Sequence, residues 1–163
     1  MDYLWTPWRY SYVAEAGREA GCIFCAALAL ADDARALIVF RSRKNFIILN
    51  RFPYATGHSM VVPFAHIPDL AAADAETLAE LMQLTRRLQM ALEGLYRPQG
   101  YNLGMNLGLI AGAGVAGHIH MHVLPRWAGD TSFMTTVAET RVEPEDLAVT
   151  YDRLRSALAQ PDT

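Results

Sequence analysis

Short apolar segments bounded by charged residues, Pro or Gly recur along the chain. Such segments are typical of β-strands, and the charged residues 41–44 between the first two predict a hairpin loop. The last segment alternates histidine strictly with apolar residues, which is the period of a strand with two different faces. The segments that predict strands are 36–40, 45–49, 58–63, 101–107 and 118–122.

Three further segments carry helical patterns. After Asp74, which is placed as an N-cap, leucines recur at three- and four-residue steps and predict a long helix over 75–96, ended by Pro98 and Gly100. The Ala/Leu-rich segment 26–34 predicts a short helix, and Glu143-Pro144-Glu145 predicts the start of a last one. With about five strands joined mostly by hairpin-length loops, the pattern favours an α+β domain with a mainly antiparallel sheet.

The composition supports one folded domain. The chain has 163 residues, of which 52% are hydrophobic and 19% charged, and its net charge is −3. This charge gives no basis for binding a nucleic-acid backbone, so we expect no nucleic-acid partner. No apolar run is as long as a membrane span, and the first residues do not have the pattern of a signal peptide, so we expect no membrane partner and a cytoplasmic location.

The first 20 residues are rich in aromatic side chains, including two tryptophans and three tyrosines. Aromatic residues at this density usually pack against other parts of the protein. We expect segment 1–20 to be an arm that packs on its own domain. The alternative is an arm that covers a partner subunit or lines the site of a purine ring.

Three of the five histidines of the chain lie at alternate positions, 118, 120 and 122. On a strand, these three side chains share one face, while Ile119, Met121 and Val123 point toward the other. Imidazole is both a nucleophile and a proton carrier near neutral pH. The row therefore predicts a functional site.

Cys22 and Cys25 are the two cysteines of the chain, and two residues separate them. In a reducing compartment this spacing indicates a metal-binding pair or a redox pair rather than a structural disulfide. We expect a knuckle-like turn around them.

With these motifs, the chain resembles the histidine triad (HIT) family. The resemblance covers about residues 20–127 and rests on the histidine row, Asn50, the Gly57-His58 pair, the glycine-bearing loop 108–117 and Pro125-Arg126. The opening Leu4-Trp5-Thr6-Pro7-Trp8-Arg9 and the segment Asn102–Gly108 are similar to the bacterial diadenosine tetraphosphate phosphorylase branch. The resemblance implies a HIT-like fold, with the HIT domain over 21–127 and a C-terminal loop and helix, 128–163, packed on the same domain.

The family's chemistry implies four catalytic histidines. His120 is expected to attack the α-phosphorus of a nucleotide and form a covalent nucleotidyl-histidine. A backbone carbonyl near His118 is expected to orient the His120 ring. His122 is expected to contact phosphate oxygens or to protonate the leaving group, and His58 to lie beside the row and tune it. Water or phosphate then releases the nucleotide.

The resemblance also implies binding residues. Asn50 and Asn106 match positions that bind ribose or phosphate, and Gly112 and Gly114 let backbone N–H groups approach a phosphate. This loop lacks the Ser, Thr or Gln that many relatives carry. Some family members bind a structural zinc ion, and the matching ligands here are Cys22, Cys25, His66 and His118.

The expected function is therefore cleavage of dinucleoside polyphosphates, by phosphorolysis or by hydrolysis. The alternatives are a nucleoside phosphoramidate hydrolase, a nucleotide- or zinc-binding module without turnover, and a redox protein that uses Cys22 and Cys25. The family pairs its subunits across a two-fold axis, so we expect a homodimer, or a tetramer as in part of the branch.

Overall fold

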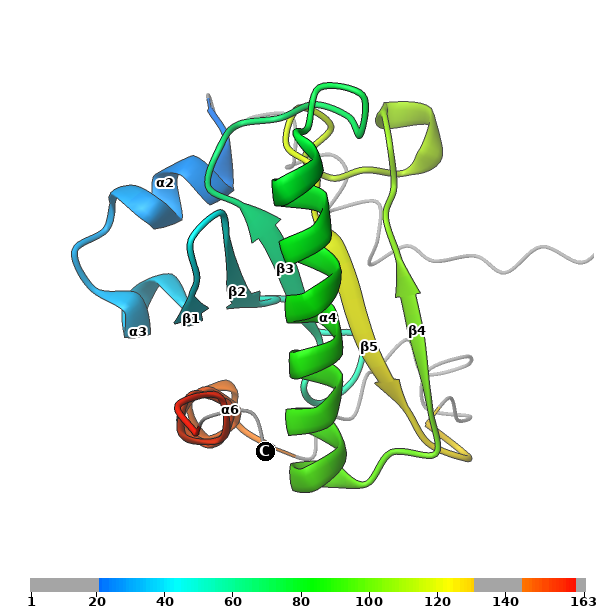
Figure 1. Cartoon of the computed structure of the whole chain (residues 1–163). Coiled ribbons are helices and arrows are strands. Elements are labelled where there is room, and N and C mark those ends of the chain that lie inside the picture. Colours follow the sequence, from blue (N-terminus) through cyan, green and yellow to red (C-terminus); the bar gives the residue numbers. More distant parts are fainter. Residues whose placement is uncertain (1–20, 131–144, 161–163) are drawn as a thin grey trace, which may run out of the picture.

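An antiparallel sheet of five strands organises the computed structural model, which describes residues 21–130 and 145–160 (Figure 1). The order of the strands is β1-β2-β3-β5-β4, so β1 and β4 form its two edges. The predicted arm over 1–20 lies outside the described residues. The strands are β1 Ile38–Arg41, β2 Asn45–Leu49, β3 Ser59–Pro63, β4 Gly100–Gly104 and β5 Met121–Arg126.

The long predicted helix is confirmed as α4, Ala75–Tyr96, and the Oδ1 atom of Asp74 caps it by accepting a hydrogen bond from the Thr77 N–H. The single helix predicted over 26–34 is wrong, because two helices share this region. They are α2, Ile23–Ala29, and α3, Asp33–Ala36, and the second starts where the side chain of Asp32 caps a new helix.

The last helix, α6, spans Leu147–Leu158 and is capped by Asp146. It therefore starts later than predicted, because the Asp146 side chain accepts from the Ala148 N–H; Glu143 and Pro144 lie outside the described residues. A short 3-10 helix, η1, covers Leu109–Ala111. No helix in the described ranges is long and apolar enough to cross a bilayer.

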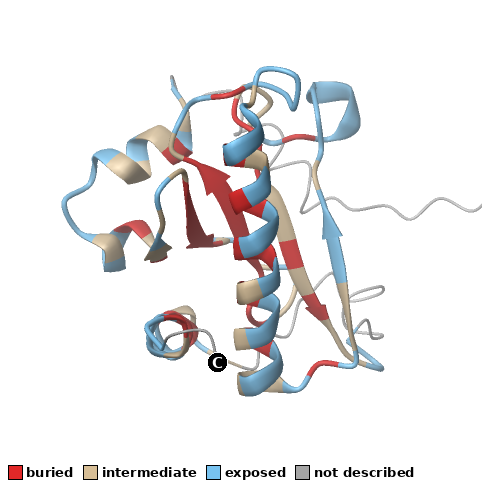
Figure 2. Cartoon of the chain, viewed as in Figure 1, coloured by how far each residue is buried: buried red, intermediate tan, exposed pale blue. Residues whose placement is uncertain are grey.

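The central strands β2 and β3 are buried (Figure 2), and apolar side chains pack on both of their faces. On one face, Ile47, Leu49 and Val61 pack with residues of α4 and α6, which lie on this side of the sheet. On the other face, Ile48 and Met60 pack with Phe24 of α2. Two buried faces explain why the sequence of β2 is a continuous apolar run and not an alternating one.

The sequence predicts that the whole histidine row lies on a strand. This prediction is wrong for the first two histidines of the row, because β5 begins only at Met121. Val61 pairs with Met121, and two residues further along β3 the next hydrogen-bonded pair in this register would be Pro63 with Ile119, but Pro63 has no N–H to donate. The N–H of Ile119 donates instead to the carbonyl of Ile67. His118 and His120 therefore precede the strand, and only His122 lies on it.

A buried carboxylate holds the β1–β2 hairpin. Glu80 of α4 is 5% exposed, and it accepts hydrogen bonds from the N–H of Lys44, the hydroxyl of Ser42 and the side-chain amide of Asn45. Burial raises the pKa of the Glu80 carboxyl, but these hydrogen bonds outweigh that effect and the net pKa lies below its ordinary value. The positive loop is therefore bound to the helix.

Replacing Glu80 by alanine is expected to lower the free energy of unfolding by about 3 kcal/mol, because several buried donors lose their acceptor. Because the folded-state pKa is depressed, this contribution is present above the unfolded carboxyl pKa and is lost as the pH falls through the folded one. Urea unfolding at neutral and acidic pH measures both effects. The control is Glu76→Ala, whose exposed ion pairs predict less than about 1 kcal/mol; equal losses in the two variants would contradict the prediction.

Candidate functional site

His120 is held in one orientation. Its Nδ1 lies 2.8 Å from the carbonyl oxygen of His118, so Nδ1 carries the proton and donates it. The Nε2 atom then holds the free electron pair, and it has no hydrogen-bond partner within the described residues. Burial lowers the pKa of His120, although the bond to the carbonyl opposes this shift. The ring is therefore neutral near pH 7, with an available nucleophilic nitrogen.

A chain of hydrogen bonds sets the protonation of His122. The backbone N–H of Tyr54 donates to Nδ1 of His58, so the proton of neutral His58 lies on Nε2. That Nε2 is 2.9 Å from Nδ1 of His122, which must accept. Burial and the neighbouring His120 lower the pKa of His122 to about 4. His122 is therefore neutral and carries its N–H on Nε2.

The pairing register explains where His122 points. It lies opposite Met60 on β3 and Gly104 on β4, so it shares their face of the sheet, away from α4. Gly104 has no side chain on this face, and a Cβ there would meet nothing within 4 Å. Among the described residues, the edge of the sheet beside His122 is therefore open, and the ring of His120 lies 4.9 Å from that of His122.

Gly57 positions the histidine that follows it. Its φ is +80°, a conformation that residues with a Cβ rarely adopt, and an added Cβ would lie 2.7 Å from the side chain of Leu92. The N–H of His58 is tied to the carbonyl of Ala55, which closes the turn before β3. The Gly-His pair in the sequence thus reflects a turn that requires glycine.

Replacing Gly57 by alanine is expected to destabilise the protein by about 2 kcal/mol, through backbone strain and the clash with Leu92. Guanidinium unfolding measures this loss. The matched control is Gly94→Ala in α4, where a Cβ meets nothing within 4 Å and the helix gains up to about 1 kcal/mol. A neutral or stabilising Gly57→Ala variant would show that the turn adapts.

Loop 108–117 presents backbone donors. Gly112 has a φ of +85° and ends η1, and the Asn106 side chain donates to its carbonyl. Among residues 21–130 and 145–160, no acceptor meets the four successive N–H groups from Gly114 to Gly117. Asn50 accepts from the N–H of Phe52, which leaves its amide as a donor near Met60. Gly112, Asn50 and Asn106 are among the residues predicted from the sequence to bind phosphate and ribose.

A second cluster joins residues from three segments. The ligand atoms of Cys22, Cys25, His66 and His118 all lie within 4.8 Å of one another. The Sγ–Nδ1 distances are 3.2 Å for Cys22 and His118, 3.4 Å for Cys25 and His66, and 3.8 Å for Cys25 and His118. These four residues are the predicted metal set, and the structure brings them together.

His118 belongs to both parts of the site. Its Nδ1 faces the cysteines, and its Nε2 lies 2.9 Å from the carbonyl of Pro63. Its own backbone carbonyl holds His120. The ring is 0% exposed, and burial lowers its pKa. His118 thus contributes to the histidine row through its carbonyl, while its ring belongs to the cysteine cluster.

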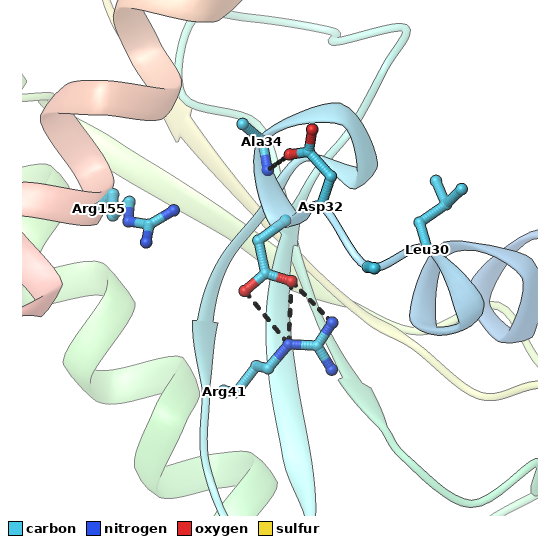
Figure 3. A pocket seen from close by; sticks show the side chains of 7 residues that line it. Leu30, Asp32, Ala34, Arg41 and Arg155 are labelled. Carbon is cyan, nitrogen blue, oxygen red and sulfur yellow. Dashed lines mark hydrogen bonds and ion pairs between the residues drawn. The ribbon is translucent and has the colours of Figure 1, made fainter.

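Two hollows in the described surface have neither His120 nor His122 in their linings. One of about 610 Å³ lies between α3, β1 and α6, where Arg41 binds the carboxylate of Asp33 (Figure 3). In the close-up, Arg155 enters it from α6 and has no ion pair to the residues drawn. The other, of about 430 Å³, is lined by His58, Thr56 and the start of α6.

The fold and the histidine site define a histidine triad protein. A profile of the HIT domain matches residues 32–129, more than half of the chain, and the chain belongs to this family. It is 37% identical over 167 residues to an AP-4-A phosphorylase of Mycobacterium tuberculosis, covering 98% of this chain and 86% of that protein. The predicted family and HIT-like fold are therefore confirmed.

Solved structures agree with this assignment. A zinc-bound histidine triad family protein from Mycobacterium smegmatis is 30% identical, with a TM-score of 0.61 and coverage of 91% of this chain and 92% of that one. A histidine triad nucleotide-binding protein from Sulfolobus tokodaii is 24% identical with a TM-score of 0.62, covers 91% of each chain and shares the fold.

Sequence reasoning missed the supporting residues. Tyr54 and Pro63 orient the histidines through a backbone N–H and a carbonyl, which every sequence offers at almost every position. Phe24 packs against two of the histidine rings. The only sequence feature that could have indicated this role is its position between two cysteines.

Proposed function

We propose that this protein cleaves dinucleoside polyphosphates, with diadenosine tetraphosphate as the first substrate to test, through a nucleotide bound covalently to His120. The observation that carries the proposal is the fixed tautomer of His120: Nδ1 donates to the His118 carbonyl, and Nε2 keeps its electron pair. A neutral imidazole held in this way is a good nucleophile for phosphorus. The relative from Mycobacterium tuberculosis, whose name is AP-4-A phosphorylase, matches nearly the whole chain and supports this substrate.

The step at His120 is an in-line displacement. Nε2 bonds to the α-phosphorus of the substrate, the bond to the bridging oxygen breaks, and ATP leaves. The Nε2–H of His122, oriented by His58, donates to a phosphate oxygen or to the leaving group. Attack by phosphate on the adenylyl-histidine then gives ADP, whereas attack by water gives AMP.

Backbone amides are the donors that we propose for the phosphate groups. Charge grows on the phosphate oxygens during the displacement, so preorganised donors stabilise the transition state. The N–H groups of Gly114 to Gly117, and the bend that Gly112 allows, provide such donors in a loop without hydroxyl side chains. Asn50 and Asn106 are the proposed contacts to ribose or phosphate.

We also propose that the ion held by the cysteine cluster is zinc and that its role is structural. Zn²⁺ bound to two sulfurs at about 2.3 Å and two nitrogens at about 2.0–2.1 Å separates neighbouring ligand atoms by about 3.3–3.8 Å. Of the three observed sulfur–nitrogen distances, 3.4 and 3.8 Å fall in this range and 3.2 Å lies just below it. All four ligand atoms lie within 4.8 Å of one another, so a small inward movement would complete the shell. The Nε2–H of His118 donates to Pro63, as second ring nitrogens of zinc-bound histidines commonly do. Four protein ligands leave no position for substrate.

Product analysis tests the reaction. The whole protein is incubated with diadenosine tetraphosphate, with and without inorganic phosphate. ATP plus ADP that requires phosphate indicates phosphorolysis, and AMP plus ATP indicates hydrolysis through the adenylyl-histidine. Two ADP would indicate hydrolysis at another phosphorus and would contradict that intermediate. Cleavage of a nucleoside phosphoramidate alone, or nucleotide binding with no product, would overturn the proposal in favour of the other two interpretations. A thiol-dependent reaction that survives the loss of His120 would favour a redox protein.

We further propose a homodimer of this chain, in the cytoplasm, where two free cysteines remain reduced. β4 is an edge strand, and apolar side chains are exposed around it, with Leu103 at 46% and Ile110 at 104% exposure. We expect light scattering to give about twice the 18.1 kDa mass of one chain. A mass of one chain at micromolar concentration would exclude the dimer, and four chains would indicate the tetramer.

A further inference from the structure

Phe24 connects the cysteine cluster to the nucleophilic histidine. It lies in α2 between Cys22 and Cys25 and is 1% exposed. Its ring is 5.4 Å from that of His118, edge-on, and 5.0 Å from that of His120, tilted. One buried aromatic ring thus touches both a member of the metal set and the histidine that we propose as the nucleophile.

A second connection runs through the backbone of His118. Its ring nitrogens face Cys22 and the Pro63 carbonyl, so the ring is held on both sides. Its carbonyl oxygen accepts the Nδ1–H of His120 at 2.8 Å. A shift of the backbone at His118, which the contacts of its ring oppose, would therefore move the acceptor that selects the tautomer of His120.

The helix that carries Phe24 has little support of its own. α2 has seven residues, and its N-cap residue, Cys22, makes no side-chain capping bond. Helices this short are marginal in isolation, so tertiary contacts must hold them. Here those contacts are the burial of Phe24, with Ala27 and Leu28 packed on the same apolar cluster, and the approach of the two cysteines to His66 and His118.

We propose that metal binding by Cys22, Cys25, His66 and His118 sets the orientation of His120, and that Phe24 is the positioning residue between the two sites. This rests on the proposed function in one respect, the role of His120 as nucleophile. With the ion bound, α2 is held against the sheet, Phe24 packs on both rings, and the His118 carbonyl stays on Nδ1 of His120. Without the ion, the thiols and His66 separate, and both connections loosen.

The first test reads the tautomer directly and needs no activity. Imidazole ¹⁵N signals of the whole protein are compared with one equivalent of Zn²⁺ and after removal by a chelator, and the His120→Asn variant assigns the signals of His120. The loaded protein is expected to show a single neutral Nδ1–H form of His120, and the stripped protein a mixture of both tautomers. Identical His120 signals in the two states would overturn the proposal.

The second test compares two buried phenylalanines. Phe24→Leu is expected to keep one bound Zn²⁺ but to slow formation of the nucleotide adduct by about tenfold, with KM unchanged, because the nucleophile is misoriented. The matched control is Phe46→Leu, since Phe46 is 0% exposed in the same apolar cluster but stacks on Phe64. Equal adduct rates in the two variants would overturn the role of Phe24.

The two proposals fail in different ways. If the wild type forms no adduct with any nucleotide, the proposed function fails, while the ¹⁵N comparison still decides whether the ion orients His120. If the adduct forms at the same rate in stripped and loaded protein, the proposed function stands and the coupling fails. If Phe24→Leu does not fold, the comparison of zinc-loaded and stripped wild-type protein still tests whether the ion orients His120.

Discussion

Replacing His120 by asparagine is expected to abolish the covalent nucleotide adduct and to lower kcat by at least about 10⁴-fold. The reason is that neither the other two histidines of the row nor His58 offers an oriented ring nitrogen with a free electron pair. His58 and His118 use both ring nitrogens in hydrogen bonds, and His122 presents a donor. The measurement is the intact mass of the protein after brief mixing with diadenosine tetraphosphate. The wild type gains one adenylyl group, and peptide mapping assigns it to His120.

The matched control is His122→Asn, which removes the proposed donor but keeps the nucleophile. We expect this variant to form the adduct more slowly, by roughly 10²- to 10⁴-fold, and still on His120. The unfolding free energy of both variants shows whether the fold is retained. An adduct of undiminished rate in His120→Asn, or an adduct mapped to another residue of the wild type, would contradict the mechanism.

Replacing Cys25 by serine is expected to eliminate tight zinc binding and to lower the free energy of unfolding by about 4 kcal/mol. For a chain of this size, that loss corresponds to a decrease in Tm of about 10 °C. The reason is that the four ligands come from α2, the loop after β3 and the segment before β5, so the ion ties together segments that are far apart in sequence. Metal content and thermal unfolding measure the two effects.

Ala26→Ser is the control, because it adds the same hydroxyl to an exposed neighbour of Cys25 in α2. We expect it to bind Zn²⁺ and to unfold like the wild type. Treatment of the wild type with a chelator should lower its Tm to that of Cys25→Ser, and Zn²⁺ should restore it. A wild-type protein that binds neither Zn²⁺ nor Co²⁺, or a Cys25→Ser variant of unchanged Tm, would show that the cluster is a pair of free thiols.

Much of the fold can be predicted from the sequence, because the patterns that indicate its helices and strands are local. The leucine spacing after Asp74 predicts α4 within its observed bounds, and apolar runs between charged or Gly/Pro residues predict the strands. These patterns report burial and capping, which act over three to five residues. Family resemblance added the expected roles of the histidines, which spacing alone does not assign.

Local signals failed where a distant residue decides the outcome. The start of β5 depends on Pro63, because a strand ends where its neighbour has no N–H to offer. The contacts that hold the predicted hairpin loop are equally distant, because Glu80 lies 36 residues after Lys44. The division of 26–34 into two helices is different, since it depends on a local signal, the capping side chain of Asp32.

From the sequence alone one can predict which histidines alternate, which glycines bend the backbone and where the long helix lies. Each of these features follows from the conformational preferences of neighbouring residues. The folded arrangement decides which nitrogen of each imidazole carries a proton, because its partners are a carbonyl at His118, an amide at Tyr54 and a ring at His58. It also decides that Phe24 touches two histidines nearly a hundred positions away, since such contacts arise only when the sheet brings distant segments together.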